Sequence, residues 1–134
     1  MDSQVLLAER KLNVLMVEDN ADTATSAACL LRHEGHRVSV ARTGVEAIRL
    51  AEICQPDVML IDIGLPGDMT GYDVARKMYD MPSERRPLLV AVTGYGTPED
   101  RQHSQEAGID LHLVKPVEPN ALFRLLERFR RVIG

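Results

Sequence analysis

Five short apolar runs alternate with longer amphipathic segments along the chain. The runs cover residues 12–17, 37–41, 57–63, 87–93 and 111–115. Strand and helix patterns that alternate in this way are typical of a parallel sheet with helices on both faces. The first, third and fourth runs are nearly continuous in Val, Leu, Met and Ile, which indicates strands buried on both faces. The run 37–41, RVSVA, alternates apolar and polar residues and is an edge-strand candidate.

The segments between and after these runs predict five helices. Three of them are ADTATSAACLLRHEG at 21–35, TGVEAIRLAEICQ at 43–55 and GYDVARKMYD at 71–80. The last segment, residues 118–133, has apolar residues at three- and four-residue spacing and predicts a firmly packed helix. Residues 98–108, PEDRQHSQEAG, offer almost nothing apolar besides Ala107. We therefore expect this helix to be held only loosely.

Length, composition and charge restrict the class of protein. A chain of 134 residues with 45% hydrophobic and 27% charged residues fits one ordinary globular domain. The net charge of -4 argues against direct binding to nucleic acid. The basic residues are scattered, apart from one group that fits the solvated face of a terminal helix: Arg124, Arg128, Arg130 and Arg131.

The sequence also indicates where the protein resides. No run approaches the roughly 18 apolar residues of a membrane span. The first residues, MDSQVLLAERK, lack the pattern of a secretion signal. Cys29 and Cys54 lie among apolar neighbours in the sequence, where free thiols behave as small hydrophobic groups. We expect a cytoplasmic protein that contacts no membrane.

Reactive side chains collect where the apolar runs end. Glu18 and Asp19 follow the first run, Asp62 lies at the end of the third, Thr93 ends the fourth and Lys115 ends the fifth. In open parallel sheets, ligands bind outside the carboxyl ends of the strands. Taken alone, each residue fits a simpler role as a helix cap, a turn residue or a surface charge. Their joint placement at successive strand ends favours a shared site.

The chemistry of these residues points to a metal and a phosphoryl group. Three carboxylates at one edge repel one another, and hard divalent cations such as Mg²⁺ bind to carboxylates, water and phosphate oxygens. A strand-end aspartate can act as a nucleophile toward phosphorus, and Asp62, followed closely by the small Gly64, is the best candidate. Lys115 and Thr93 would donate to phosphoryl oxygens, and Gly94 lets the backbone approach closely.

From about Lys11 to Ile133 the chain resembles the receiver domain of two-component response regulators. The resemblance is carried by the acidic pair Glu18–Asp19 and by DIGLP, VTGYG and LVKP, which occur in the family's order. It implies a flavodoxin-like (βα)5 doubly wound parallel sheet of strand order 2-1-3-4-5 over residues 11–134, with residues 1–10 as an N-terminal extension. VTGYG and LHLVKPV look most like receivers of hybrid histidine kinases. The chain would then be a stand-alone receiver without an output domain, or a receiver from a larger protein.

The resemblance also implies a role for the acids in a phosphorelay. Asp62 would accept phosphate from a histidine kinase or a histidine phosphotransfer protein. Asp19 and Asp62 would bind Mg²⁺ (or Mn²⁺) together with the backbone carbonyl of Gly64. Glu18, which replaces the more common aspartate, would act on the metal through water.

Other residues are implied to bind and sense the phosphoryl group. Lys115 would pair with its oxygens, and Thr93 would turn inward to bond one of them. Backbone N–H groups of Ile63 and Gly94 would complete the cradle, and the peptide bond before Pro116 would be cis. Phosphorylation is thus expected to switch the face made by the fourth helix, the fifth strand and the fifth helix.

Two further positions depart from the family's pattern. His112 stands where the family has its switch aromatic, three residues before the lysine. It could couple switching to pH, although an exposed and solvated histidine is the simpler interpretation. The segment DIGLPGDMTGY has one residue more than usual between the acceptor and the glycine matching Gly71, so we expect an unusual loop path.

Three alternative functions fit parts of the pattern. A haloacid-dehalogenase-like phosphatase also uses a strand-end aspartate with Mg²⁺, but it resembles a pattern with a second Asp where this chain has Gly64. A flavin or dinucleotide module needs a glycine- or hydroxyl-rich loop after the first strand, and EDNAD is acidic there. A degenerate receiver, acting only as a protein-interaction module, would lack site residues that are present here. We expect a phosphoacceptor that catalyses only its own phosphorylation and dephosphorylation, rather than an enzyme.

Overall fold

The computed structural model of the chain describes residues 11–82, 84, 86–94 and 98–133. The expected extension, residues 1–10, lies outside this part. The strands are β1 (Asn13–Val17), β2 (Arg37–Ala41), β3 (Val58–Asp62), β4 (Leu88–Thr93) and β5 (Leu111–Val114). The helices are α2 (Ala21–His33), α3 (Gly44–Cys54), α4 (Gly71–Tyr79), α5 (Pro98–Glu106) and α6 (Pro119–Ile133). The strands pair in parallel in the order β2-β1-β3-β4-β5, which confirms the predicted fold and strand order.

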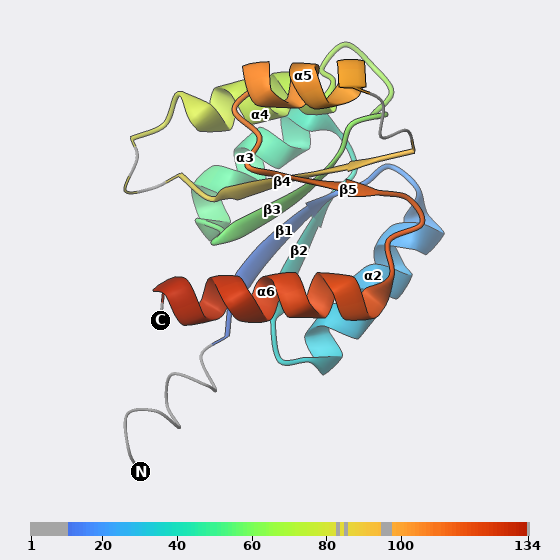
Figure 1. Cartoon of the computed structure of the whole chain (residues 1–134), viewed down its shortest axis with the longest axis vertical. Helices are drawn as coiled ribbons and strands as arrows, with labels where there is room; N and C mark the ends of the chain where they lie inside the picture. The colour runs from blue at the N-terminus through green and yellow to red at the C-terminus, as the bar shows by residue number, and fades with distance from the viewer. Residues whose placement is uncertain (1–10, 83, 85, 95–97, 134) are drawn as a thin grey trace.

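The sheet is covered on both faces, with α2 and α6 on one side and α3, α4 and α5 on the other (Figure 1). Side chains of one strand therefore enter two separate cores in alternation. In β1, Leu15 and Val17 pack toward α3 and α4, whereas Val14 and Met16 pack toward α2 and α6. The central strand β3 is buried throughout, as its continuous apolar sequence predicts, and the edge strands β2 and β5 are only partly buried.

Side-chain caps start three helices close to the carboxyl edge of the sheet. Asn20, Thr43 and Thr70 each accept the amide of the third residue after them, at 2.9, 3.1 and 3.2 Å. The Thr70 amide in turn donates to the Asp73 carboxylate at 2.9 Å and completes a capping box. Because these caps fix the entry of each helix, they also fix the short segments that follow β1, β2 and β3.

The helix α5 buries little, as its sequence predicts. Within the helix only Ser104 is buried, and Ala107 follows it. Tyr72 of α4 contacts α5 in two ways. Its ring centroid lies 5.7 Å from that of His103, and its hydroxyl donates to the Asp100 carbonyl at 3.5 Å. A polar helix with so few buried contacts opens at low free-energy cost, so the loose hold remains a prediction of its burial pattern.

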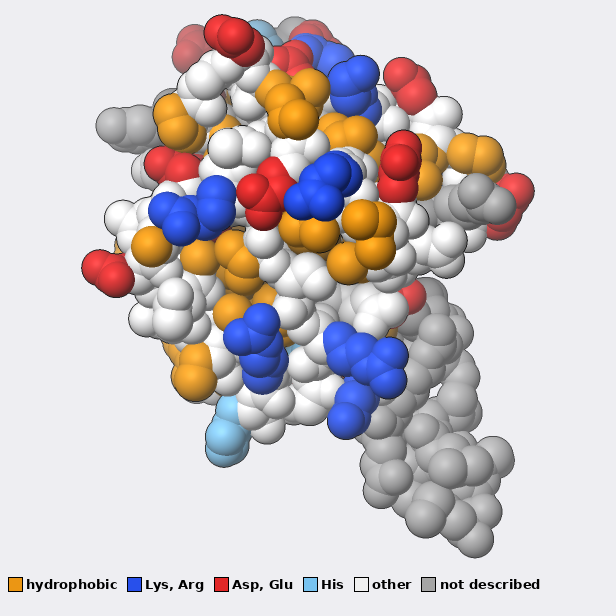
Figure 2. Space-filling model, turned by 180° about the vertical axis from the view of Figure 1, so that it is seen from behind, with side chains coloured by type: hydrophobic (Ala, Val, Ile, Leu, Met, Phe, Trp, Pro, Cys, Tyr) orange, Lys and Arg blue, Asp and Glu red, His pale blue; other side chains and the backbone are white. Residues whose placement is uncertain are grey.

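The surface corrects two details of the sequence interpretation. Cys29 is exposed rather than packed as a hydrophobic group, although both cysteines are free. Three of the four C-terminal arginines are exposed, but Arg130 is partly buried and pairs with Glu127. On the face shown in Figure 2, basic side chains lie among acidic and hydrophobic ones. Among the described residues, no helix is long and apolar enough to span a bilayer.

Candidate functional site

The carboxyl ends of β1 and β3 bring three acidic side chains together. These strands are neighbours, and their register pairs Val17 with Ile61, so that Glu18 and Asp62 follow at the same level. One carboxylate oxygen from each of Glu18, Asp19 and Asp62 lies within 4.8 Å of the other two. The sheet order thus produces the acidic cluster that the sequence pattern predicts.

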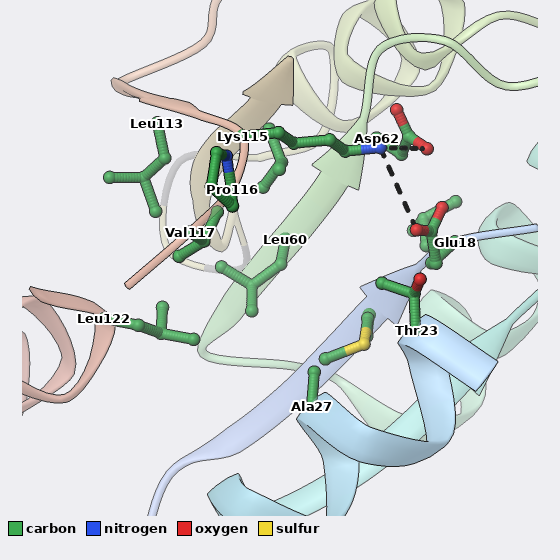
Figure 3. Close-up of a pocket in the computed structure, with 13 residues that line it drawn as sticks. Glu18, Thr23, Ala27, Leu60, Asp62, Leu113, Lys115, Pro116, Val117 and Leu122 are labelled. Atoms are coloured by element: carbon green, nitrogen blue, oxygen red, sulfur yellow. Dashed lines mark hydrogen bonds and ion pairs between the residues drawn. The ribbon is translucent and has the colours of Figure 1, made fainter. Parts of the chain in front are cut away.

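Lys115 reaches the same cluster from β5, across the end of β4 (Figure 3). Its Nζ lies 3.0 Å from Oδ2 of Asp62 and 3.9 Å from Oε1 of Glu18. The Lys115 amide donates to the Thr93 carbonyl at 2.6 Å, and the peptide bond to Pro116 is cis, as expected. One ammonium therefore faces three carboxylates.

Burial and mutual repulsion shift the protonation of this group. Burial, a hydrogen bond with Asp62 and the negative charge of Asp62 raise the pKa of Glu18 to about 7. Burial also acts to raise the pKa of Asp62, but hydrogen bonds from Glu18, Gly64 and Lys115 outweigh it and lower that pKa. For Lys115, burial acts to lower the pKa, and the bond to Asp62 and the acidic charges raise it. Lys115 thus opposes the rise in the pKa of Glu18 only in part.

The donor set fits a hard divalent cation. Oε2 of Glu18 is buried and has no hydrogen-bond partner in the described part of the chain. A buried carboxylate oxygen without a donor is costly, and a cation shared with neighbouring carboxylates removes that cost. Asp19 is half-buried and so stays accessible to a cation entering from solvent. The cluster therefore suits a divalent metal bound by oxygen ligands.

The backbone after Asp62 corrects one detail of the implied phosphoryl cradle. The Ile63 amide continues the sheet and donates to the Val92 carbonyl at 3.0 Å, so it is already used. The Gly64 amide instead donates to Oδ1 of Asp62 at 2.9 Å. At the end of β3, the N–H that faces the Asp62 carboxylate belongs to Gly64, whereas that of Ile63 is used in the sheet.

Gly71 packs directly on the end of β3. A Cβ at Gly71 would lie 2.5 Å from the Asp62 carbonyl oxygen and 2.9 Å from Cα of Ile63. The longer loop before it turns through Gly67, whose φ is +97°. Met69 then packs against Gly44 at the start of α3. This loop is exposed at Pro66, Gly67 and Asp68, and the backbone after Asp62 stays close to the start of α4.

Two positions are expected to sense the phosphoryl group: Thr93 at the carboxyl end of β4 and His112 within β5. Thr93 is 5% exposed at the end of β4, and Gly94 follows it on the surface. His112 is paired beside Ala91 of β4 and is half-buried. Both of its ring nitrogens are buried, with no hydrogen-bond partner among the described residues. The expectation of an exposed, solvated histidine is therefore wrong.

A cavity of about 540 Å³ opens beside the cluster, between the sheet, α2 and α6. Its walls are mainly apolar and include Leu60, Leu113 and Leu122 (Figure 3). Asp62 and Lys115 form its polar end. The reactive groups thus stand at the edge of a hydrophobic hollow, where a low local dielectric strengthens their mutual interactions.

Comparison with known proteins identifies the family. The model of the response regulator receiver domain matches residues 14–127. The aerobic respiration control sensor protein ArcB of Escherichia coli (strain K12) is 39% identical over 119 residues, which are 88% of this chain and 15% of ArcB. An uncharacterized 14.6 kDa protein of Leptolyngbya boryana is 31% identical over 119 residues, 89% of this chain and 90% of that protein.

Solved structures give the same result. The receiver domain of the sensor histidine kinase PA1611 from Pseudomonas aeruginosa PAO1 superposes with a TM-score of 0.80 at 32% identity, covering 90% of this chain and 98% of that one. That structure has a magnesium ion in its active-site cleft. The chemotaxis protein CheY4 of Vibrio cholerae gives a TM-score of 0.82 at 26% identity, covering 90% of this chain and 99% of that one. The chain belongs to the response regulator receiver domain family of two-component signalling.

Proposed function

We propose that Asp62 is the phosphoacceptor of a phosphorelay, and that a histidine kinase or a histidine phosphotransfer protein is the donor. A carboxylate oxygen of Asp62 attacks the phosphorus of the donor's phosphohistidine. The P–O bond forms as the P–N bond breaks, and the bond's electron pair leaves with the imidazole nitrogen. The observation that carries this proposal is the Lys115 ammonium 3.0 Å from Asp62, within a cluster of three acids.

The proposed metal is Mg²⁺ (or Mn²⁺), held by Asp19, Asp62 and the Gly64 carbonyl, with Glu18 acting through water. When bound, the cation supplies positive charge that offsets the acids and the incoming phosphoryl oxygens. Its preference for oxygen ligands matches the buried Glu18 oxygen, which has no donor among the residues that the structure describes. The magnesium in the PA1611 receiver supports the choice of metal.

The chain's own donors then hold the transferred group. Lys115 loses its partner in the Asp62 carboxylate as the acyl phosphate forms, and its ammonium moves to a phosphoryl oxygen. The Gly64 and Gly94 amides donate to the remaining oxygens, and the Thr93 hydroxyl turns inward to join them. Because Thr93 ends β4 and its segment leads to α5, the movement is passed to the face formed by α5, β5 and α6.

The proposed phosphoryl donor, a histidine kinase or a histidine phosphotransfer protein, also implies where the protein acts and what role it has. A phosphoacceptor served by a histidine kinase acts in the cytoplasm and passes its signal by contact with a protein partner. Apart from its own phosphorylation and dephosphorylation, it turns over no substrate. A phosphatase of the haloacid-dehalogenase type is less suited to the site because Gly64 offers no acid two residues after Asp62.

Acetyl phosphate tests the proposal directly. The wild-type protein, incubated with acetyl phosphate and Mg²⁺, should gain one hydroxylamine-labile phosphoryl group by intact mass. Asp62→Asn should gain none. Asp68→Asn, which removes an exposed carboxylate from the same loop, is the matched control and should behave as wild type. Modification that persists in Asp62→Asn would show that another residue accepts the group.

A further inference from the structure

The guanidinium of Arg42 is hydrogen-bonded to the backbone of Asp19. Nε and Nη2 of Arg42 donate to the Asp19 carbonyl oxygen at 3.0 and 2.8 Å. Arg42 directly follows the last residue of β2, and its side chain lies on the surface. Two donors of one planar fork on a single acceptor fix both the position and the direction of that carbonyl.

The same end of β2 also holds the neighbouring acid. The Glu18 amide donates to the Ala41 carbonyl at 2.9 Å, one residue before Arg42. On the far side of Asp19, Asn20 caps α2 through its side chain. The peptide unit of Asp19 is therefore held on both sides, whereas Arg42 contacts its carbonyl and leaves its carboxylate oxygens for another ligand.

We propose that Arg42 is a positioning residue for the metal site, which keeps the Asp19 carboxylate directed at the cation and so tightens Mg²⁺ binding. This inference rests on the proposed function of the acidic cluster. Partners that orient a metal ligand from outside the coordination sphere typically change metal affinity by about 10- to 100-fold when they are removed. Arg42 acts through the backbone of Asp19, so we expect its loss to give the lower end of that range.

Charge and positioning predict opposite signs for the loss of Arg42. A guanidinium beside a cation site repels the cation, so that its removal on electrostatic grounds alone would leave Mg²⁺ binding unchanged or make it tighter. The loss of an anchor for Asp19 makes binding weaker. The direction of the change therefore separates a residue that positions a ligand from a surface charge that lies nearby.

The test is Mg²⁺ titration by calorimetry at fixed ionic strength. We expect Arg42→Met to raise the dissociation constant for Mg²⁺ about tenfold. Arg42→Lys keeps the charge but loses the fork, and it should also bind Mg²⁺ more weakly than wild type. Arg37→Met makes the same change of charge at the exposed opposite end of β2 and should stay within about twofold of wild type. Unchanged or tighter binding by folded Arg42→Met overturns the inference.

Two controls keep the outcome decisive. Urea unfolding shows whether each variant folds; if Arg42→Met does not, Arg42→Lys decides, with weaker Mg²⁺ binding as support and unchanged binding as refutation. The wild type separates the two proposals. If it binds Mg²⁺ and is phosphorylated while Arg42→Met binds Mg²⁺ equally well, only the role of Arg42 fails. If the wild type neither binds Mg²⁺ nor accepts phosphate, the proposed function fails and the inference fails with it.

Discussion

The Lys115 ammonium lies 3.0 Å from the Asp62 carboxylate, although 53 residues separate the two in sequence. The strand β4 lies between their strands, so Lys115 must reach across its end. This pair supplies the only ammonium within contact of the acids among the described residues. Hydrogen bonds from Glu18, Gly64 and Lys115 lower the pKa of Asp62. Under the proposed function, the ammonium also stands where the phosphoryl oxygens would arrive.

The pair gives the first prediction. Lys115→Met should lower the rate of phosphorylation by acetyl phosphate about 100-fold, because a preorganised charge that meets the transferring group is lost. The rate is measured by intact mass against time at saturating Mg²⁺. Lys77→Met, which removes an exposed lysine from α4, should leave the rate unchanged. A Lys115→Met rate within about threefold of wild type would contradict this role.

The acidic cluster predicts how Mg²⁺ changes stability. A ligand that binds only the folded state at 100 times its dissociation constant adds about 2.7 kcal/mol to the free energy of unfolding. Wild-type protein should show this gain in urea unfolding when Mg²⁺ is added. Asp19→Asn should lose most of the gain because a proposed metal ligand is missing. Asp22→Asn, an exposed acid in the first turn of α2, should keep it. Equal gains in wild type and Asp19→Asn would exclude Asp19 as a ligand.

Much of this arrangement follows from the sequence because strand ends meet at one edge of a parallel sheet. Once the five runs and their order are assigned, the meeting of Glu18 with Asp62 needs no further information. The amide that faces Asp62 could not be predicted in the same way. Whether the N–H of Ile63 or that of Gly64 faces the carboxylate depends on how far the β3–β4 pairing continues, and apolar patterning does not set that limit.

Arg42 and His112 illustrate a second kind of gap. The bonds from Arg42 join residues 23 positions apart through a backbone carbonyl, and every residue offers such a carbonyl. No side-chain pattern marks the partner. The run LHLVK shows that His112 lies in a strand, but its burial depends on how α5 and its neighbours cover that side of β5. Contacts between elements decide both features, whereas periodicity reports only on each element itself.

The buried His36 predicts a pH dependence of stability. Burial and the charge of Arg130 lower its pKa, and Glu34 and Glu127 only partly oppose this. The folded state therefore binds fewer protons than the unfolded state below about pH 6.5. The stability that neutral His36 contributes is present above that pH and is lost as the pH falls toward the folded-state pKa.

The measurement compares His36→Gln with wild type by urea unfolding between pH 7.5 and about pH 5. Wild type should lose stability relative to His36→Gln as the pH falls, by at most about 1.4 kcal/mol for each pH unit. Other groups that titrate in this range, such as Glu18, are common to both proteins and cancel in the difference. His33→Gln, an exposed change at the end of α2, should show no such divergence. A constant difference across the range would exclude His36 as its source.

The imidazole of His112 has no hydrogen-bond partner in the described part of the chain, which predicts a gain in stability on substitution. A buried polar group without a hydrogen bond costs about 1–3 kcal/mol, and two ring nitrogens are in this state. His112→Phe removes both nitrogens while keeping a planar ring, so urea unfolding should show a free energy of unfolding about 1 kcal/mol higher. His33→Phe places the same ring on the surface and should give no gain. A folded His112→Phe variant that is less stable than wild type would contradict the prediction. The imidazole would then have a favourable interaction in the folded protein that outweighs the cost of its buried nitrogens.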